Sequence, residues 1–307
     1  MKIVFDYKIF FQQQFGGPSR YFSKLFEYLN KNKENAYIVS PIYTNDYLKY
    51  SNFKKNIYGK KISPKPFFGR FYKYLNKNIS ELIISKLNPD VVHTTYYDEY
   101  LIKQKKPIIL TVHDIIHEIF HKDFGFEKNH RPKKKMIDRA DHIICVSTST
   151  KKDLMEYYNV DEKKISVIYH GVSTNEIAKN YSLKIEKPFF LYVGSRKRYK
   201  NFKIFLEAYC LDRSISKDFN LICFGGGSFL AEEYELFKTL NIDSTQISNF
   251  IGDDNLLTYL YQNAQALIYP SIYEGFGMPI LEAMRLKCPV ICSNTSSMPE
   301  VYGNSCL

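Results

Sequence analysis

The sequence predicts an α/β protein built from two doubly wound parallel sheets, and three observations lead to this fold class. The chain has 307 residues, which suits two domains of roughly 150 residues each better than one core. Short apolar runs rich in β-branched residues recur along it at intervals long enough for a helix. These runs are continuously apolar, as is typical of strands covered by helices on both faces.

Two series of runs predict the individual strands and assign them to two sheets. The first series comprises residues 2–7, 36–43, 90–96, 108–114, 142–147 and 165–171, and the second comprises 189–195, 220–226, 247–252, 266–271 and 289–294. Between the series, residues 172–187 have weak periodicity and stop just before Pro188. We therefore expect an N-terminal domain over 1–172, a linker over 173–187 and a C-terminal domain over 188–307.

Composition excludes several classes of protein. No run of about 18 uncharged apolar residues is present to span a bilayer, and Asp6 and Lys8 interrupt the first apolar run, which predicts a strand and not a signal peptide. The cysteines are scattered singly, mostly in apolar runs, as reduced core thiols are: Cys145, Cys210, Cys223, Cys288, Cys292 and Cys306. Cys288 and Cys292 lack nearby histidines and make a poor metal site. We expect a cytoplasmic protein.

The stretch "YPSIYEGFGMPILEAM" (269–284) joins a predicted strand to a predicted helix, with Pro279 suited to the first helical turn. Gly275 and Gly277 allow backbone amides to approach a ligand, and the helix N-terminus attracts phosphate or hydroxyl groups. Glu274 begins the turn and Glu282 lies about one turn into the helix, so both carboxylates can accept O–H bonds from one ligand. The alternative is that the first is a loop charge and the second a solvated helix residue.

The segment "VGSRKRYKN" (193–201) follows another predicted strand, with Asn201 a candidate N-cap for the next helix. Arg196 and Lys200 therefore lie beside a helix N-terminus, where fixed cations can neutralise a pyrophosphate leaving group. A solvated basic patch is the alternative, and for Lys197 and Arg198 it is an adequate explanation.

Three further strand-end segments carry weaker signals. Gly16 and Gly17 follow the first strand, with Arg20 entering the next helix, although a glycine pair is more often a tight turn. The segment "FGGGSF" (224–229) lacks the full spacing of a dinucleotide fingerprint. His113 lies at the carboxyl end of the predicted strand 108–114, where it either reaches a ligand or is a satisfied, partly buried histidine.

A competing pattern is "HEIFH" (117–121), which fits two zinc-binding histidines and a general base on one helix. It has only three fixed positions and directly follows a strand. The nearby candidates for a third ligand are Glu127 and His130, in a basic segment broken by proline. A zinc hydrolase therefore remains a remote alternative.

Together, "GGPSRY", "VIYHGV", "YVGSRKRYKN", "LYQNAQALIYPS", "EGFGMPILEAM" and "PVICSNTSSMPEVYG" resemble the motifs of retaining glycosyltransferases of the family 4 (group 1) type, and "GSRKRYKN" is most similar to bacterial mannosyltransferases. The resemblance spans essentially the whole chain. It implies the GT-B fold, in which two Rossmann-like domains face a cleft and the second binds the nucleotide sugar. It also implies transfer of a hexose with retained configuration, in surface polysaccharide biosynthesis.

Carried over to this sequence, the resemblance implies that Glu274 contacts the transferred sugar and Glu282 the ribose, with Gly275, Phe276 and Gly277 completing the donor-binding turn. Arg196 and Lys200 would bind the diphosphate, Gly17 would approach it from the first domain, and His113 would lie near the sugar. The implied donor is GDP-mannose or a UDP-sugar, without a divalent metal or other cofactor. Asp253 and Asp254 fit a helix entry and not a D-x-D metal site.

The excess positive charge lies in the first half of the chain, where residues 1–172 hold 30 basic and 18 acidic residues. Residues 47–80 interleave basic and aromatic side chains with no acid, and Lys54, Lys55, Lys60 and Lys61, with Arg20, are the candidate contacts. They suit a glycan or lipid-linked acceptor or an anionic membrane, at the inner face of which we place the protein; nucleic acid is disfavoured. A solvated loop is the alternative.

Members of this family usually continue past "PEVYGNSCL" with a further strand and helices. We therefore expect the second domain to be incomplete at its C-terminus, with low thermal stability and weak turnover. An inactive or truncated glycosyltransferase-like binding protein is the alternative function. The donor's base and sugar, the acceptor and the oligomeric state stay open from sequence.

Overall fold

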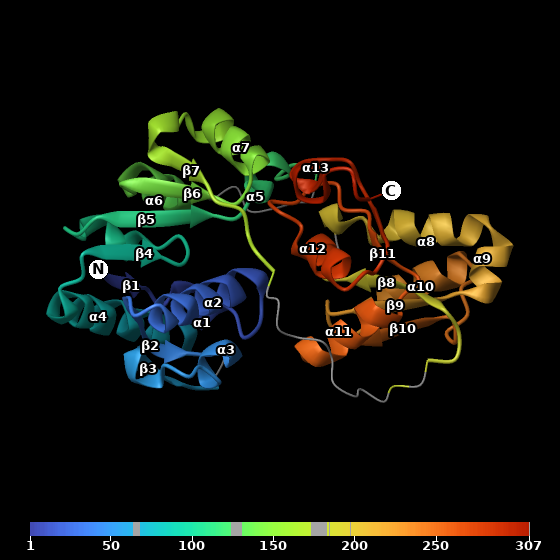
Figure 1. Cartoon of the computed structure of the whole chain (residues 1–307), viewed down its shortest axis with the longest axis horizontal. Helices are drawn as coiled ribbons and strands as arrows, with labels where there is room; N and C mark the ends of the chain where they lie inside the picture. Colours follow the sequence, from blue (N-terminus) through green and yellow to red (C-terminus); the bar gives the residue numbers. More distant parts are fainter. Residues whose placement is uncertain (64–67, 124–130, 173–182, 184, 197, 307) are drawn as a thin grey trace. The chain divides into compact units, whose positions relative to one another are not determined.

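The computed structural model describes residues 1–307 except 64–67, 124–130, 173–182, 184, 197 and 307 (Figure 1). Residue contacts divide the chain into two compact units. The first comprises Met1–Glu118, Glu127–Val146 and Lys151–Ile168, and the second comprises Ile119–Phe126, Ser147–Thr150 and Tyr169–Leu307. Most of the expected linker, 173–187, falls outside the described residues.

The first unit contains a parallel seven-stranded sheet with the order β3-β2-β1-β4-β5-β6-β7. Its strands are Lys2–Phe5 (β1), Asn35–Tyr43 (β2), Ile57–Lys61 (β3), Val91–Thr94 (β4), Ile108–Val112 (β5), His142–Cys145 (β6) and Ile165–Val167 (β7). Six of these strands confirm the first series of apolar runs. The parallel pairing confirms the fold class that continuous apolar runs predict.

The edge strand β3 has no counterpart among the predicted strands, because its sequence IYGKK is not a continuous apolar run, is mostly exposed and lies in the basic stretch. A Cβ atom on Gly59 would lie 1.7 Å from the carbonyl oxygen of Ser40 in β2. Glycine therefore permits the close backbone approach beside the register shift between these two strands. The requirement for glycine at position 59 comes from the neighbouring strand, so it cannot be recognised from the periodicity of the sequence around β3.

Helices connect these strands. They are Lys8–Gln12 (α1), Gly17–Lys31 (α2), Asp46–Lys49 (α3), Gly69–Leu87 (α4), Ile116–Ile119 (α5), Arg131–Arg139 (α6) and Thr148–Tyr158 (α7), with short 3-10 helices at Lys54–Asn56 (η1), Glu99–Lys103 (η3) and Glu162–Lys164 (η4). Phe22 and Phe26 of α2 are fully buried and pack in one apolar cluster with β1 and β2. Asn76 of α4 is also fully buried. Its Oδ1 accepts a hydrogen bond from Ile42 N of β2 at 2.8 Å, and its Nδ2 donates one to Ile42 O at 3.0 Å.

A buried carboxyl group lies just beyond β1. Asp6 is fully buried, and its Oδ1 accepts hydrogen bonds from Thr95 N and Thr95 Oγ1, each at 2.6 Å. Burial raises the pKa of Asp6 to about 7, with the Asp98 charge raising it further and Thr95 and Lys8 opposing the shift. Because the folded state binds this proton more tightly than the unfolded chain, the contribution of Asp6 to stability declines as pH rises from about 4 to about 7.

Replacing Asp6 with asparagine should remove this pH dependence, since the amide oxygen can still accept both bonds from Thr95. We expect similar melting temperatures for D6N and wild type at pH 5, and a more stable D6N at pH 8, by up to about 4 kcal/mol. Thermal melts across this range measure the difference, with the exposed Asp138→Asn as control. Parallel melting curves for wild type and D6N across the range would contradict the assignment.

The second unit contains a parallel five-stranded sheet with the order β10-β9-β8-β11-β12. Its strands are Phe189–Val193 (β8), Asn220–Phe224 (β9), Ile247–Phe250 (β10), Ala266–Tyr269 (β11) and Val290–Cys292 (β12). Its helices are Phe202–Leu211 (α8), Arg213–Asp218 (α9), Ala231–Thr239 (α10), Asp254–Asn263 (α11), Met278–Arg285 (α12) and Met298–Tyr302 (α13), with a 3-10 helix at Arg198–Lys200 (η5). All five strands confirm the second series of runs.

Helices cover both faces of the second sheet. Leu191 and Val193 of β8 pack in a core cluster that includes residues of α11 and α12. The intervening Tyr192 packs in the other cluster, with residues of α8 and α10. Alternate side chains of one strand thus enter two cores, which explains why its run is apolar throughout.

Two smaller expectations also hold in the structure. All six cysteines are free. Asp253 is the N-cap of α11 and accepts a hydrogen bond from Leu256 N at 3.0 Å, as expected for a helix-entry acid. Among the described residues, no helix combines the length and apolar character needed to cross a membrane.

Candidate active site in the second unit

The strand order of the second sheet defines where a ligand is expected. β8, the first strand in the unit, has β9 on one side and β11 on the other. The chain therefore leaves β8 and β11 in opposite directions across the sheet, and such a switch point opens a crevice at the carboxyl ends of the strands. The loops there are residues 194–201 after β8 and 270–277 after β11.

Lys200 and Glu274 meet at this switch point. The Lys200 Nζ lies 2.6 Å from Glu274 Oε1, and their side chains are 15% and 11% exposed. Lys200 Nζ also donates to Tyr269 Oη at 3.2 Å and lies 5.3 Å from the centre of the Tyr269 ring. Lys200 and Glu274 are 74 positions apart, and the sequence predicted that both bind the same ligand. In the structure they form one ion pair.

Buried tyrosines fix the two loops. Tyr192 of β8 donates from Oη to the carbonyl oxygens of Ser195 (2.8 Å) and Lys200 (3.2 Å), which holds the loop after β8 against its own strand. Burial and the charge of Glu274 raise the pKa of Tyr269 well above its ordinary value. Tyr269 is therefore a neutral hydroxyl beside the ion pair.

The turn after β11 has the geometry that its glycines and proline predict. Gly277 is the N-cap of α12 with φ 96°, a left-handed conformation, and a Cβ there would approach Ile280 Cδ1 to 3.3 Å. Pro279 lies in the first helical turn, as predicted. Glu282 Oε2, on α12, accepts a hydrogen bond from Tyr261 Oη at 3.1 Å. The second carboxylate is therefore held by α11.

Gly275 and Phe276 are buried in the same turn. The Phe276 ring contacts the His170 ring edge-on, with centroids 5.0 Å apart. Burial lowers the pKa of His170 to about 4, so the ring is neutral near pH 7. The backbone of the turn is fixed as well, since Glu274 N donates to Ser296 Oγ and Ser297 Oγ donates to Glu274 O, both at 2.8 Å.

The structure gives Arg196 a different environment from Lys200. Its side chain is 2% exposed and pairs with Glu233 of α10, with Nε 2.6 Å from Oε1. The two terminal nitrogens donate to four more acceptors, which are the carbonyl oxygens of Gly225, Gly227 and Ser228 and the side-chain oxygen of Asn249, at 2.9 to 3.1 Å. All the N–H groups of Arg196 are thus directed at the protein, and the guanidinium holds the loop after β9.

That loop requires glycine. Gly225, Gly226 and Gly227 all have positive φ (85°, 72° and 76°), and a Cβ on Gly226 would lie 2.8 Å from Gly194 O and 2.9 Å from Arg196 Nη1. The segment 224–229, whose spacing does not match a dinucleotide fingerprint, therefore forms the loop whose carbonyl oxygens bind Arg196.

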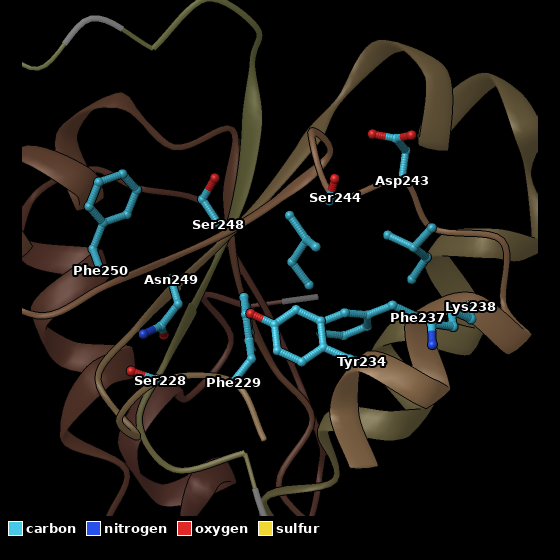
Figure 2. A pocket seen from close by; sticks show the side chains of 12 residues that line it. Ser228, Phe229, Tyr234, Phe237, Lys238, Asp243, Ser244, Ser248, Asn249 and Phe250 are labelled. Carbon is cyan, nitrogen blue, oxygen red and sulfur yellow. The ribbon is translucent and has the colours of Figure 1, made fainter. Parts of the chain in front are cut away.

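A cavity of about 740 Å³ lies beside the same network, along the edge strand β10 and helix α10 (Figure 2). Ser228, Phe229 and Asn249 belong to both, and the Arg196 guanidinium lies 4.7 Å from the centre of the Phe229 ring. The remaining lining residues are Tyr234, Phe237, Lys238, Ile242, Asp243, Ser244, Ile247, Ser248 and Phe250. Neither Lys200 nor Glu274 lines this cavity.

Besides the candidate lysines, three predicted residues lie in the first unit. Gly17 begins α2 and is exposed, with open space where a Cβ would be. His113 follows β5, and its ring packs edge-on against Tyr21 and Phe22 of α2, at centroid distances of 5.5 and 5.9 Å. Arg20 is the residue before them on the same helix. The structure thus brings His113 to the first turns of α2.

The candidate basic contacts do not share one environment. Lys61 forms an ion pair with Asp46. Lys54 and Lys55 lie on the 3-10 helix η1, and Lys60 is exposed on the edge strand β3. The described part of 47–80 is not a plain loop, the alternative considered from sequence, because it contains most of α3, η1, β3 and the start of α4.

The zinc alternative receives no support. Helix α5 ends at Ile119, so His121 is not on the helix that the pattern requires. Glu118 is buried, pairs with Lys133 at 3.0 Å and accepts a hydrogen bond from Tyr158 Oη at 2.5 Å. Within the described ranges, which omit the two candidate third ligands at 127 and 130, no group of three His, Cys, Asp or Glu could hold a metal.

Sequence reasoning missed Glu233, Asn249, Tyr261 and Tyr269, which hold the predicted residues in place. Each is separated from its partner by 21 to 69 positions. The acidic pair at the start of α10 was the one available signal for Glu233, but it also fits an ordinary helix N-terminus. Asn201 occupies the N-cap of α8 as predicted, although its side chain makes no capping bond.

Comparison with known families covers nearly the whole chain. Residues 15–176 match the family described as Glycosyltransferase Family 4, and residues 173–305 match Glycosyl transferases group 1. The two matches meet near the boundary between the units.

Individual proteins give consistent similarities. The chain is 33% identical over 224 residues to the O-antigen chain mannosyltransferase RfbU of Salmonella typhimurium, covering 72% of this chain and 60% of that protein. It is 30% identical over 184 residues to O-antigen chain mannosyltransferase B of Escherichia coli, covering 55% and 47%. It therefore spans about half to three fifths of the length of these relatives. The crystal structure of WaaG, a glycosyltransferase involved in lipopolysaccharide biosynthesis, superposes with a TM-score of 0.71 at 15% identity, covering 98% and 84% of the two chains.

Proposed function

Because this chain belongs to the family 4, group 1 glycosyltransferases, we propose that it transfers a hexose from a nucleoside diphosphate sugar to a glycan or lipid-linked acceptor. We place the reaction in surface polysaccharide biosynthesis, which is where the names of similar proteins point. The observation that carries the proposal is the Lys200–Glu274 pair at the topological switch point of the second sheet.

Each end of the donor has a matching group. Glu274 accepts hydrogen bonds from sugar hydroxyls, and Lys200 moves from the carboxylate to the diphosphate when the donor binds. Glu282, one helical turn further on, accepts bonds from the ribose diol. The amides of Gly275, Phe276 and Gly277 at the start of α12 add partial positive charge at the phosphates.

Arg196 influences the diphosphate through its positive charge, while its guanidinium is bound to the loop after β9. Its N–H groups are taken up by that loop, Asn249 and Glu233, so it contributes position and positive charge and not a direct bond.

The proposed chemistry is transfer with retention. The bond between the anomeric carbon and the diphosphate oxygen breaks, the acceptor oxygen forms the new bond on the same face, and its proton passes to the departing phosphate oxygen. Lys200 and the amide dipoles stabilise the negative charge that develops on the leaving group, so we propose that no divalent metal is required.

GDP-mannose is the proposed donor, supported by the two similar mannosyltransferases. A thermal-shift series with GDP-mannose, UDP-glucose, UDP-galactose and ADP-glucose tests it. A donor at 100 times its Kd stabilises the folded chain by about 2.7 kcal/mol, which raises the melting temperature by several degrees. We expect GDP-mannose to give the largest shift, and Glu282→Gln to reduce it. A chain whose melting temperature responds to none of the four would contradict the proposed function.

A further inference from the structure

Helix α4 presents an unusual surface to solvent. Phe71, Tyr74 and Leu82 are 53%, 65% and 63% exposed. Their spacing of three and eight residues puts them on one face of the helix. The opposite face carries Asn76, Ser80 and Ile84, which are buried, and Asn76 bonds β2. The three exposed side chains, called the α4 outer face below, therefore point away from the unit that α4 belongs to.

Positive charge borders this face. Arg70 and Lys77 are exposed and lie four and three residues from Tyr74, so they are its neighbours on the helix surface. Lys73 is also exposed, but its spacing of three and seven residues from Asn76 and Ser80 puts it on the side of the buried row. Glu81, four residues after Lys77 and directly before Leu82, is exposed and is the nearest acid along the helix. Across residues 47–80 the chain has nine lysines and arginines and no acidic residue.

We propose that the α4 outer face docks on the surface of an anionic lipid bilayer. The three apolar side chains enter the interfacial layer between head groups and acyl chains, and the cations beside them pair with lipid phosphates. Aromatic rings are favourable in this layer, because one edge can be apolar while the other stays hydrated.

Two other occupants fit the surface less well. A second copy of the chain in a two-fold dimer would place the same lysines and arginines opposite each other, which is repulsive. Single-stranded nucleic acid stacks its bases in grooves lined with aromatic rings. The outer face of a helix offers no such groove, and Leu82 offers no ring. The proposal does not depend on the proposed function, since it concerns binding to lipid without donor or acceptor.

The chain contains no tryptophan, so an introduced one reports on its own site. We expect the emission of Phe71→Trp to shift to shorter wavelength with vesicles of phosphatidylcholine containing about 30% phosphatidylglycerol, and brominated lipid to quench it. The matched control is Leu211→Trp, whose native side chain is 87% exposed in the second unit. We expect neither effect there. An unchanged Phe71→Trp spectrum, or equal changes at both positions, would overturn the proposal.

Vesicle sedimentation separates the apolar and charged contributions. We expect the full chain to bind the anionic vesicles at least about tenfold more tightly than phosphatidylcholine alone. The triple variant Phe71→Ser, Tyr74→Ser, Leu82→Ser should lose about tenfold in affinity. The variant Arg70→Gln, Lys73→Gln, Lys77→Gln should lose the preference for anionic lipid.

The charge-matched control for this experiment is Lys203→Gln, Lys217→Gln, Lys238→Gln in the second unit, which should bind as wild type does. Circular dichroism melts establish that all variants are folded. Equal binding of the wild type to both kinds of vesicle would overturn the proposal. So would self-association, or binding to a single-stranded oligonucleotide, that the serine variant abolishes while vesicle binding stays unchanged.

Discussion

Replacing Glu274 with glutamine is expected to lower kcat for release of the nucleoside diphosphate by about 100- to 1,000-fold. Effects of this size follow when one preorganised charged group is removed from a reacting centre. Glutamine keeps the shape of the side chain but removes the charge that pairs with Lys200, and it replaces one of the two oxygens proposed to accept sugar hydroxyls with an NH2 donor. The measurement is steady-state turnover with the donor that gives the largest thermal shift.

A loss of folding must be separated from a loss of chemistry, because Lys200 is only 15% exposed and would lose its ionic partner. Turnover is therefore measured well below the melting temperature of each variant. The double variant Lys200→Met, Glu274→Gln removes both charges and should restore stability without restoring turnover.

The matched control is Glu235→Gln, which breaks an ion pair of similar length (2.7 Å to Lys238) between side chains that are both at least 70% exposed. We expect no change there, since exposed pairs contribute little. Wild-type turnover by a folded Glu274→Gln variant would show that the Lys200–Glu274 pair is a structural ion pair and not part of the donor site.

Replacing Arg196 with methionine is expected to destabilise the free protein by about 3–5 kcal/mol, because Glu233 would be left as a largely buried, unpaired charge. The carbonyl oxygens of the loop after β9 would also lose their donors. Arg196→Lys should recover only part of this loss, since an ammonium group cannot reproduce the planar fork that bonds Glu233 and the loop together. Chemical denaturation without ligand measures both variants.

Glu233 provides the decisive comparison for Arg196. If Arg196 holds the loop, Glu233→Gln should also destabilise the free protein, and the double variant Arg196→Met, Glu233→Gln should cost less than the sum of the two single changes. If Arg196 serves as a direct phosphate ligand, Arg196→Lys should leave the ligand-free stability unchanged and weaken only donor binding. Exposed Arg213→Gln serves as the control for loss of an arginine in the same unit.

The strands of both units could be predicted because a strand buried on both faces must be apolar along its whole length. Eleven of the twelve described strands coincide with the expected runs. The exception, β3, is a mostly exposed edge strand without a continuous apolar run. The glycine that lets it approach β2 is required by a backbone atom of another strand, and no local pattern reports such a contact.

The candidate site divides in the same way. Local sequence was sufficient for the turn before α12, since Gly277 and Pro279 are required by backbone conformation at their own positions. It was not sufficient for Arg196 and Lys200, which lie four residues apart on one basic loop and have different partners. Lys200 pairs with the loop after β11, whereas Arg196 pairs with α10 and the loop after β9.

The sequence by itself determined the two parallel sheets, the strand-to-helix turns at their ends and the family to which the chain belongs. The tertiary structure decided which cation faces the candidate donor site, which one is buried in the protein, and which side of α4 is left to solvent. The physical reason is that periodicity and turn chemistry act between residues close in the chain. Ion pairing and burial depend instead on strand order, which brings together residues that the chain separates by dozens of positions.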